Sequence, residues 1–129
     1  MTVKIAITNQ KGGVGKTTTA VNIAASLTKA KRKVLLIDAD SQSNATSAAG
    51  ISKNSESSLY EYFLEGGDPK TYIKEAAGGY KIFPANSNLV ATEKIIEKTT
   101  TREKFFSTNL KIKEKDFDYI IIDCPPSLN

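Results

Sequence analysis

The sequence predicts an α/β fold in which helices flank an open, mostly parallel sheet. Three short apolar runs support this prediction, because unbroken runs of strand-forming residues are typical of parallel strands buried on both faces. They occupy residues 3–7, 34–37 and 119–122. Between the first two runs, Ala20, Ile23, Ala24 and Leu27 recur at helical spacing. A helix that joins two such runs indicates a βαβ unit with parallel strands.

Glycine and proline indicate where several of the remaining elements begin or end. Gly50 should end a short helix at residues 45–49, and Asp68-Pro69 is a typical helix start, so we expect a short helix reaching Ala77. We expect the first strand to be covered on both faces. The other expected elements are a helix over 17–30, one or two helical turns at 59–64, a strand at 80–83, and helices at 89–98 and around 105–110.

Composition narrows the class of protein. At 129 residues, with 40% hydrophobic content and a net charge of +4, the chain is expected to form a single domain over residues 1–129. The longest aliphatic run near the end is far shorter than the roughly 20 residues of a spanning helix. Cys124 is the single cysteine and histidine is absent, which excludes an intrachain disulfide and a His/Cys zinc site. We therefore expect a cytoplasmic protein whose metal is oxygen-ligated Mg²⁺.

Residues 10–18 read Gln-Lys-Gly-Gly-Val-Gly-Lys-Thr-Thr and lie between the first strand and the first helix. Such glycines let successive backbone N–H groups point at an anion. Lys16 would place a charge at the β/γ-phosphates, and the hydroxyl of Thr17 would bind Mg²⁺. The segment predicts a phosphate-loop (P-loop) NTPase. Its spacing is unusual, since Gln10 stands where a glycine is usual and a second lysine, Lys11, follows it.

Acidic residues follow two of the apolar runs. Asp123 ends the last run, where P-loop NTPases place the acid that holds Mg²⁺ through water; the alternative is a cap of the next turn. Asp38 and Asp40 end the second run and should lie on the same carboxyl edge. One of them would orient the attacking water or bind the Mg²⁺ shell, and helix capping is the alternative.

Other conspicuous residues have simpler interpretations. Cys124 has no histidine to activate it and should be packing material. An aromatic stripe is expected to pack a short helix on the sheet rather than stack on a base; it comprises Tyr60, Tyr62 and Phe63. A basic cluster is expected to be the solvated end of a helix rather than a contact with a partner; it comprises Lys29, Lys31, Arg32 and Lys33.

Three strings in order closely resemble the ParA/Soj-type chromosome and plasmid partitioning ATPases, over all 129 residues. They are Thr-Asn-Gln-Lys-Gly-Gly-Val-Gly-Lys-Thr-Thr-Thr at 8–19, Leu-Ile-Asp-Ala-Asp at 36–40 followed by Gln42 and Asn44-Ala45-Thr46, and Asp-Tyr-Ile-Ile-Ile-Asp-Cys-Pro-Pro-Ser-Leu at 118–128. This family belongs to the deviant P-loop (deviant Walker A) class that includes MinD.

The resemblance implies ATP and Mg²⁺ as cofactors and a role for each matching residue. Lys11 would be the signature lysine that reaches across an ATP-bound dimer to the partner's phosphates, much as an arginine finger does. Catalysis would fall to Lys11, Lys16 and Asp40. Nucleotide would contact Lys11, Gly12, Gly13, Val14, Gly15, Lys16, Thr17 and Thr18. Metal would be held by Thr17 and, through water, by Asp123, with Asp38 a weaker match.

The family also implies partners: a homodimer formed on ATP, a ParB-like centromere-binding protein and non-specific DNA, with no membrane, in a nucleoid-associated cytoplasmic protein. Its members run on for roughly as long again, so the chain is expected to be the amino-terminal half of a longer, here truncated, ATPase domain. Adenine and most DNA contacts would lie beyond Asn129. The family usually has Pro and Gly where Ser41 and Ser43 stand. Two alternatives are a nucleotide-binding fragment without turnover and a MinD-like membrane-associated ATPase, which the Gln42 and Asn44-Ala45-Thr46 pattern disfavours.

Overall fold

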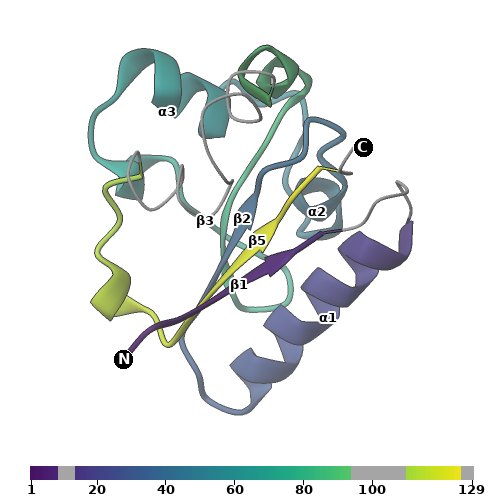
Figure 1. Cartoon of the computed structure of the whole chain (residues 1–129), viewed down its shortest axis with the longest axis vertical. Helices are drawn as coiled ribbons and strands as arrows, with labels where there is room; N and C mark the ends of the chain where they lie inside the picture. Colours follow the sequence, from purple (N-terminus) through teal and green to yellow (C-terminus); the bar gives the residue numbers. More distant parts are fainter. Residues whose placement is uncertain (9–13, 94–109, 126–129) are drawn as a thin grey trace.

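The structure of the chain, a computed structural model, describes residues 1–8, 14–93 and 110–125 (Figure 1). Its centre is a five-stranded sheet in the order β1-β5-β2-β4-β3. Neighbouring strands are parallel except β3, which is antiparallel to β4. The strands are β1 (Val3–Ile7), β2 (Val34–Asp38), β3 (Lys74–Glu75), β4 (Lys81–Phe83) and β5 (Tyr119–Asp123). The predicted fold class, a mostly parallel sheet flanked by helices, is confirmed.

The last strand, β5, lies between the first two. Asp123 at its end is in register with Ile7 of β1 and with Asp38 of β2. The carboxyl ends of the three strands are therefore level, at one edge of the sheet. All of β2, and β5 after its first residue, are buried, as their apolar sequences predict.

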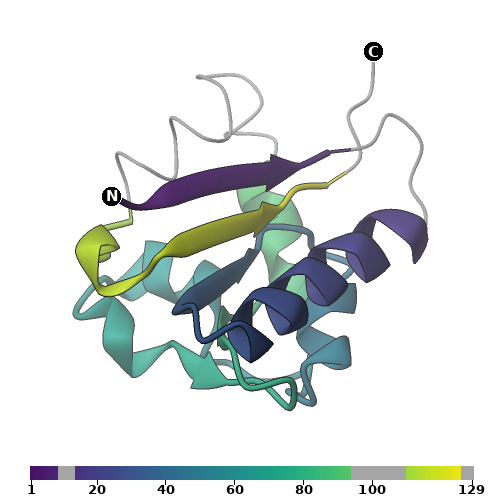
Figure 2. The same cartoon turned by 90° about the horizontal axis from the view of Figure 1, so that it is seen from below.

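Helices cover both faces of this sheet (Figure 2). The helices α1 (Val14–Lys29) and α2 (Asn44–Ala48) lie on one face, and α3 (Leu59–Glu65) lies on the other. The small side chains of Ala20 and Ala24 are fully buried, which lets α1 pack closely on Leu36 and Ile121. Among the described residues no helix has the length and hydropathy needed to cross a bilayer.

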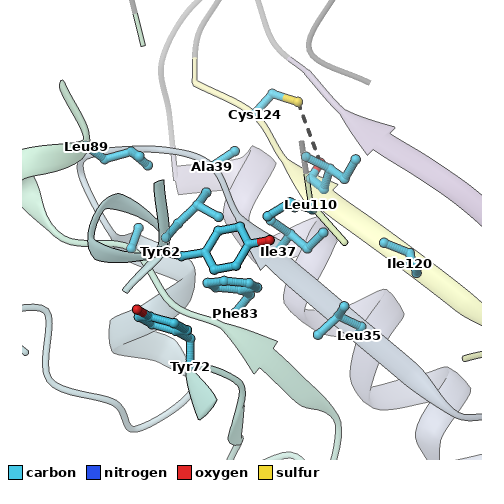
Figure 3. Packing of buried hydrophobic residues seen from close by; sticks show 13 residues of the cluster. Leu35, Ile37, Ala39, Tyr62, Tyr72, Phe83, Leu89, Leu110, Ile120 and Cys124 are labelled. Atoms are coloured by element: carbon cyan, nitrogen blue, oxygen red, sulfur yellow. Dashed lines mark hydrogen bonds between the residues drawn. The ribbon is translucent and has the colours of Figure 1, made fainter. Parts of the chain in front are cut away.

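The α3 face is packed by aromatic rings (Figure 3). The ring of Tyr62 lies 5.6 Å from those of Tyr72 and Phe83, and both pairs meet edge to face. This confirms the packing role expected for Tyr62. Cys124 is fully buried in the same cluster, which confirms it as packing material.

Two expectations about these elements are wrong. The first strand is not covered on both faces: none of its residues is buried, and Val3 is 44% exposed. The helix expected from Asp68 to Ala77 is a single 3-10 turn, η1 (Pro69–Thr71), followed by β3. A tight turn at Gly78 and Gly79, the latter at φ 89°, folds β3 back onto β4, and a helix could not make these strand hydrogen bonds.

The end of α1 agrees with the sequence. The amide of Arg32 donates to the carbonyl of Leu27 at 3.0 Å, around Lys31 in the left-handed conformation at φ 66°. All four residues of the basic cluster are exposed, and none makes an ion pair with a described residue. The helices expected at 89–98 and 105–110 fall mostly outside the described residues. The described part of this region contains the 3-10 turn η2 (Ser87–Leu89) and helical residues 90–93. A further 3-10 turn, η3 (Glu114–Asp116), comes before β5.

Candidate nucleotide-binding site

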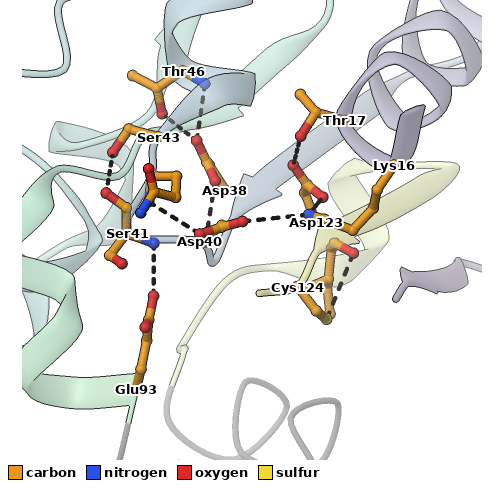
Figure 4. A network of polar contacts seen from close by, with 12 residues as sticks. Lys16, Thr17, Asp38, Asp40, Ser41, Ser43, Thr46, Glu93, Asp123 and Cys124 are labelled. Carbon is orange, nitrogen blue, oxygen red and sulfur yellow. Dashed lines mark hydrogen bonds and ion pairs between the residues drawn. The ribbon is translucent and has the colours of Figure 1, made fainter. Parts of the chain in front are cut away.

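Lys16 lies at the centre of the site, in the first turn of α1 (Figure 4). Its side chain is buried; its Nζ donates to Oδ1 of Asp123 and lies 3.6 Å from Oδ2 of Asp40. The hydroxyl of Thr17 donates to Oδ2 of Asp123 at 3.1 Å. Parallel strand order places Asp123 and the end of β2 beside the start of α1, so residues from three separate motifs meet.

Burial and the contact with Lys16 act in opposite directions on the pKa of Asp123. The carboxyl group is fully buried, and burial raises its pKa. The hydrogen bond and the positive charge of Lys16 oppose that shift without cancelling it. Any ligand that draws Lys16 away therefore leaves a buried acid in need of another positive partner.

Asp38 faces a different part of the molecule. Its Oδ2 accepts from the amide of Thr46 at 2.9 Å and from the Thr46 hydroxyl at 2.6 Å, and its Oδ1 accepts from the amide of Asp40 at 3.2 Å. Burial, with a smaller contribution from the charge of Asp123, raises the pKa of Asp38 to about 7 despite the Thr46 hydrogen bonds. Asp40 thus points to Lys16 while Asp38 holds α2, as expected if one of the two faces the phosphates.

A tight turn follows Asp40. The carbonyl of Asp40 accepts from the amide of Ser43 at 2.9 Å, and Oδ1 of Asp40 accepts from the amide of Gln42 at 3.0 Å. Ser43 adopts the left-handed conformation at φ 60° that glycine takes most easily. The loop with Ser41 and Ser43 therefore still closes as a turn.

Two residues here were not predicted as functional. The Thr46 hydroxyl accepts from the amide of Ala85 at 2.8 Å while donating to Asp38, so it joins α2 to the ends of β2 and β4. Glu93 accepts from the amide of Ser41 at 2.6 Å. Thr46 lies inside a recognised string, but nothing in the sequence marks Glu93.

The other predicted site residues are placed in part. Lys11, Gly12 and Gly13 lie outside the described residues, and Val14 opens α1. Gly15 is exposed and has open space where a Cβ would stand. Thr18 is exposed and, with Thr17, lines an open cavity of about 310 Å³ between α1 and α2, completed by Val21, Asn22, Asn44 and Ala48. The roles of all these residues stay predictions.

The donors present fit Mg²⁺ and phosphate. Thr17 and Asp123 offer a hydroxyl and a carboxylate, the hard oxygen ligands that Mg²⁺ takes. Lys16 stands at the start of a 16-residue helix, whose dipole and free amides favour an anion. A parallel sheet with these groups at its carboxyl edge defines a P-loop nucleotide-binding domain.

Comparison with known proteins names the family. The profile of the AAA domain family matches residues 2–129, and the chain belongs to that family. It is 44% identical over 126 residues to the sporulation initiation inhibitor protein Soj of Bacillus subtilis, covering 96% of this chain and 50% of Soj. It is 43% identical over 126 residues to the chromosome partitioning protein ParA of Myxococcus xanthus, covering 96% of this chain and 44% of that protein. The ParA/Soj resemblance is thus confirmed, and the chain spans about half the length of these relatives.

Solved structures agree. A structure of cobyrinic acid a,c-diamide synthase from Mycobacterium smegmatis with bound ADP and magnesium matches with a TM-score of 0.86 and 38% identity, over 100% of this chain and 53% of that one. A plasmid partition protein from Borrelia burgdorferi matches with a TM-score of 0.74 and 31% identity, over 98% of this chain and 57% of that one. The expected cofactors, ATP and Mg²⁺, agree with the ligands in the first of these structures and with the ATP analogue and magnesium in a second structure of the same enzyme.

Proposed function

We propose that residues 1–129 are the amino-terminal half of the ATPase domain of a ParA/Soj-type partitioning ATPase. The complete protein would bind and hydrolyse Mg-ATP, dimerise on ATP, and act in segregating plasmid or chromosomal DNA with a ParB-like partner. The observation that carries this proposal is the meeting of Lys16, Thr17, Asp40 and Asp123 at one sheet edge. The names of the relatives and the ligands of the solved neighbours support it.

We infer a role for each of these residues from the contacts of Lys16 and from the family resemblance. Lys16 exchanges the carboxylates of Asp123 and Asp40 for the β/γ-phosphates, because both sets of partners are anionic and lie at the start of α1. Thr17 and, through water, Asp123 would hold Mg²⁺, which would neutralise charge on the phosphates. Asp40, released from Lys16, accepts a hydrogen bond from the attacking water and orients it. Lys11 of a second subunit completes the charge around the phosphates.

The test uses the full-length protein. ATP binding, ATP turnover and the mass of the assembly are measured with and without ATP, for the wild type and for Lys11→Ala. We expect ATP to produce a dimer and Lys11→Ala to abolish dimerisation or turnover while leaving the monomer folded. A protein that binds no ATP, or whose dimerisation ignores both ATP and Lys11→Ala, would refute the proposal.

A second candidate concerns the 129-residue chain alone: a nucleotide-binding module without turnover. The favouring observation is the exposed outer edge of β1, which pairs with β5 alone among the described strands. An unpaired edge also invites self-association. Measuring ATP hydrolysis by this chain beside the full-length protein decides the matter, and ordinary turnover by the short chain would exclude this candidate.

A further inference from the structure

The turn after Asp40 is a four-residue turn with Ser41 and Gln42 at its centre. The carbonyl of Asp40 accepts from the amide of Ser43. Neither central residue has a positive φ, since Lys31 and Ser43 are the non-glycine residues of the described chain that do. This is the pattern of a type I turn, in which the second position accepts proline readily.

The turn also sets the side chain of Asp40. One carboxylate oxygen accepts from the amide of Gln42 at 3.0 Å, while the other lies 3.6 Å from Nζ of Lys16. The direction of the carboxylate is therefore coupled to the backbone of the turn. A rotation of the peptide units around Ser41 would change both contacts.

Among the described residues, one backbone hydrogen bond joins the centre of the turn to another element. The amide of Ser41 points out of the turn and donates to Oε1 of Glu93 at 2.6 Å (Figure 4). In the described part of the chain, the other hydrogen bonds of the Ser41 and Gln42 backbone stay within the turn: the Gln42 amide donates to Asp40, and the Ser41 carbonyl accepts from the Ser43 hydroxyl at 3.2 Å. Glu93 is half-buried in the helical segment 90–93. A bond from an amide to a carboxylate is charge-assisted, and about twice as strong as a neutral one.

We propose that Glu93 is a positioning residue: by holding the Ser41 amide it fixes the turn that aims Asp40. The inference rests on the proposed function, in which Asp40 orients the attacking water. Without Glu93, the Ser41 amide must find water or another acceptor, and the peptide units of the turn rotate to reach it.

This role makes a specific prediction about proline at position 41. Proline has no amide hydrogen and presets a φ near −65°, which suits the second position of the turn. Ser41→Pro should therefore fix the turn and remove the donor that Glu93 serves. Loss of Glu93 should matter when residue 41 is serine and cease to matter when it is proline.

The first experiment measures ATP turnover and ATP affinity of the full-length protein. We expect Glu93→Ala to lower kcat about tenfold, equivalent to about 1.4 kcal/mol, with a change in ATP affinity below about threefold. Glu93→Gln keeps an oxygen acceptor, so its kcat should stay within about threefold of the wild type. The double variant Ser41→Pro/Glu93→Ala should recover to the level of Ser41→Pro alone. Wild-type kcat in Glu93→Ala, or a double variant as slow as Glu93→Ala, would overturn the proposal.

The second experiment does not depend on ATPase activity. Amide hydrogen exchange of Gln42 and Ser43 is measured in the nucleotide-free protein, with the amides of α1 as an internal reference. We expect Glu93→Ala to speed exchange at these two amides at least about fivefold relative to α1 and the double variant to restore it. Unchanged exchange in Glu93→Ala overturns the positioning role, whereas a protein that binds no ATP overturns the proposed function.

Discussion

Raising the pH should destabilise the nucleotide-free chain through Asp38. Burial raises the pKa of this group from 3.8 to about 7. Because the folded-state pKa lies above the unfolded value, the folded chain keeps a proton that the unfolded chain has lost. The stabilisation is complete below pH 3.8 and is lost as the pH rises through about 7. The difference between the two pKa values corresponds to about 4 kcal/mol.

Asp38→Asn separates this effect from other titrations. Asparagine offers one acceptor oxygen where Asp38 serves the amide and hydroxyl of Thr46 and the amide of Asp40, so one donor loses its partner. That loss costs about 1–2 kcal/mol at any pH. The variant should therefore be less stable than the wild type at about pH 4, and more stable by about 2–3 kcal/mol at about pH 8.

Urea unfolding followed by far-UV circular dichroism, in the presence of a chelator and across this pH range, measures the difference. Glu56→Gln, at an exposed carboxylate, is the matched control and should show no crossing. If Asp38→Asn differs from the wild type by the same free energy at every pH, then Asp38 does not hold its proton in the folded state and the reasoning is wrong.

Three further changes are tested by urea unfolding, two in the network around Asp38 and Asp123 and one at the end of α1. Lys16→Ala should destabilise the nucleotide-free chain by about 3 kcal/mol, because Asp123 stays buried without a cation. Adding Asp123→Asn should recover most of this loss. An equal loss in the single and the double variant would contradict the ion pair. Thr46→Val should lower the free energy of unfolding by about 3 kcal/mol, because the amide of Ala85 loses its acceptor and Asp38 loses a donor. The lost donor should also raise the pKa of Asp38 further. An unchanged free energy of unfolding would show that Thr46 is dispensable. Lys31→Gly should stabilise the chain by about 1 kcal/mol, because Lys31 holds φ 66°, and a lower free energy of unfolding would contradict this.

The elements that the sequence predicts well are those set by local pattern. The runs that became β2 and β5 are apolar at every buried position, and α1 carries its small residues at helical spacing. The region after Asp68 shows where local pattern fails. Asp68 does cap a turn, accepting from the amide of Lys70 at 3.0 Å, but the helix stops after η1 because the next residues pair with β4. That pairing depends on a partner strand, which the local signal for a helix start cannot report.

In the site, too, the sequence predicts the residues that belong to local motifs but not the contacts that depend on distant residues. Lys16, Thr17, Asp40 and Asp123 were predictable together, because a P-loop motif and two strand-end acids must share the carboxyl edge of a parallel sheet. The sequence could not show that Asp40 faces Lys16 while Asp38 binds Thr46, because this depends on where Thr46 lies in the fold. Glu93 accepts a hydrogen bond from Ser41, which is far from it in sequence, and Glu93 belongs to no recognisable motif. The parts of the chain around Lys11 lie outside the described residues, so the role of the second lysine remains a prediction.

The insertion of β5 between β1 and β2 has a consequence for the order of folding. Among the described strands β1 pairs with β5 alone, whereas β2 pairs with both β4 and β5. β1 therefore has no strand partner, and β2 lacks one of its two, until residues 119–123 are available. Long-range parallel pairing of this kind is slow, because the intervening chain must close a large loop first. During synthesis, β1 therefore stays unpaired, and the part of α1 that packs on Ile121 stays uncovered, until β5 is made. We expect nascent chains released before residue 119 to depend on chaperones, and those that include residue 123 to acquire protease resistance in a single step.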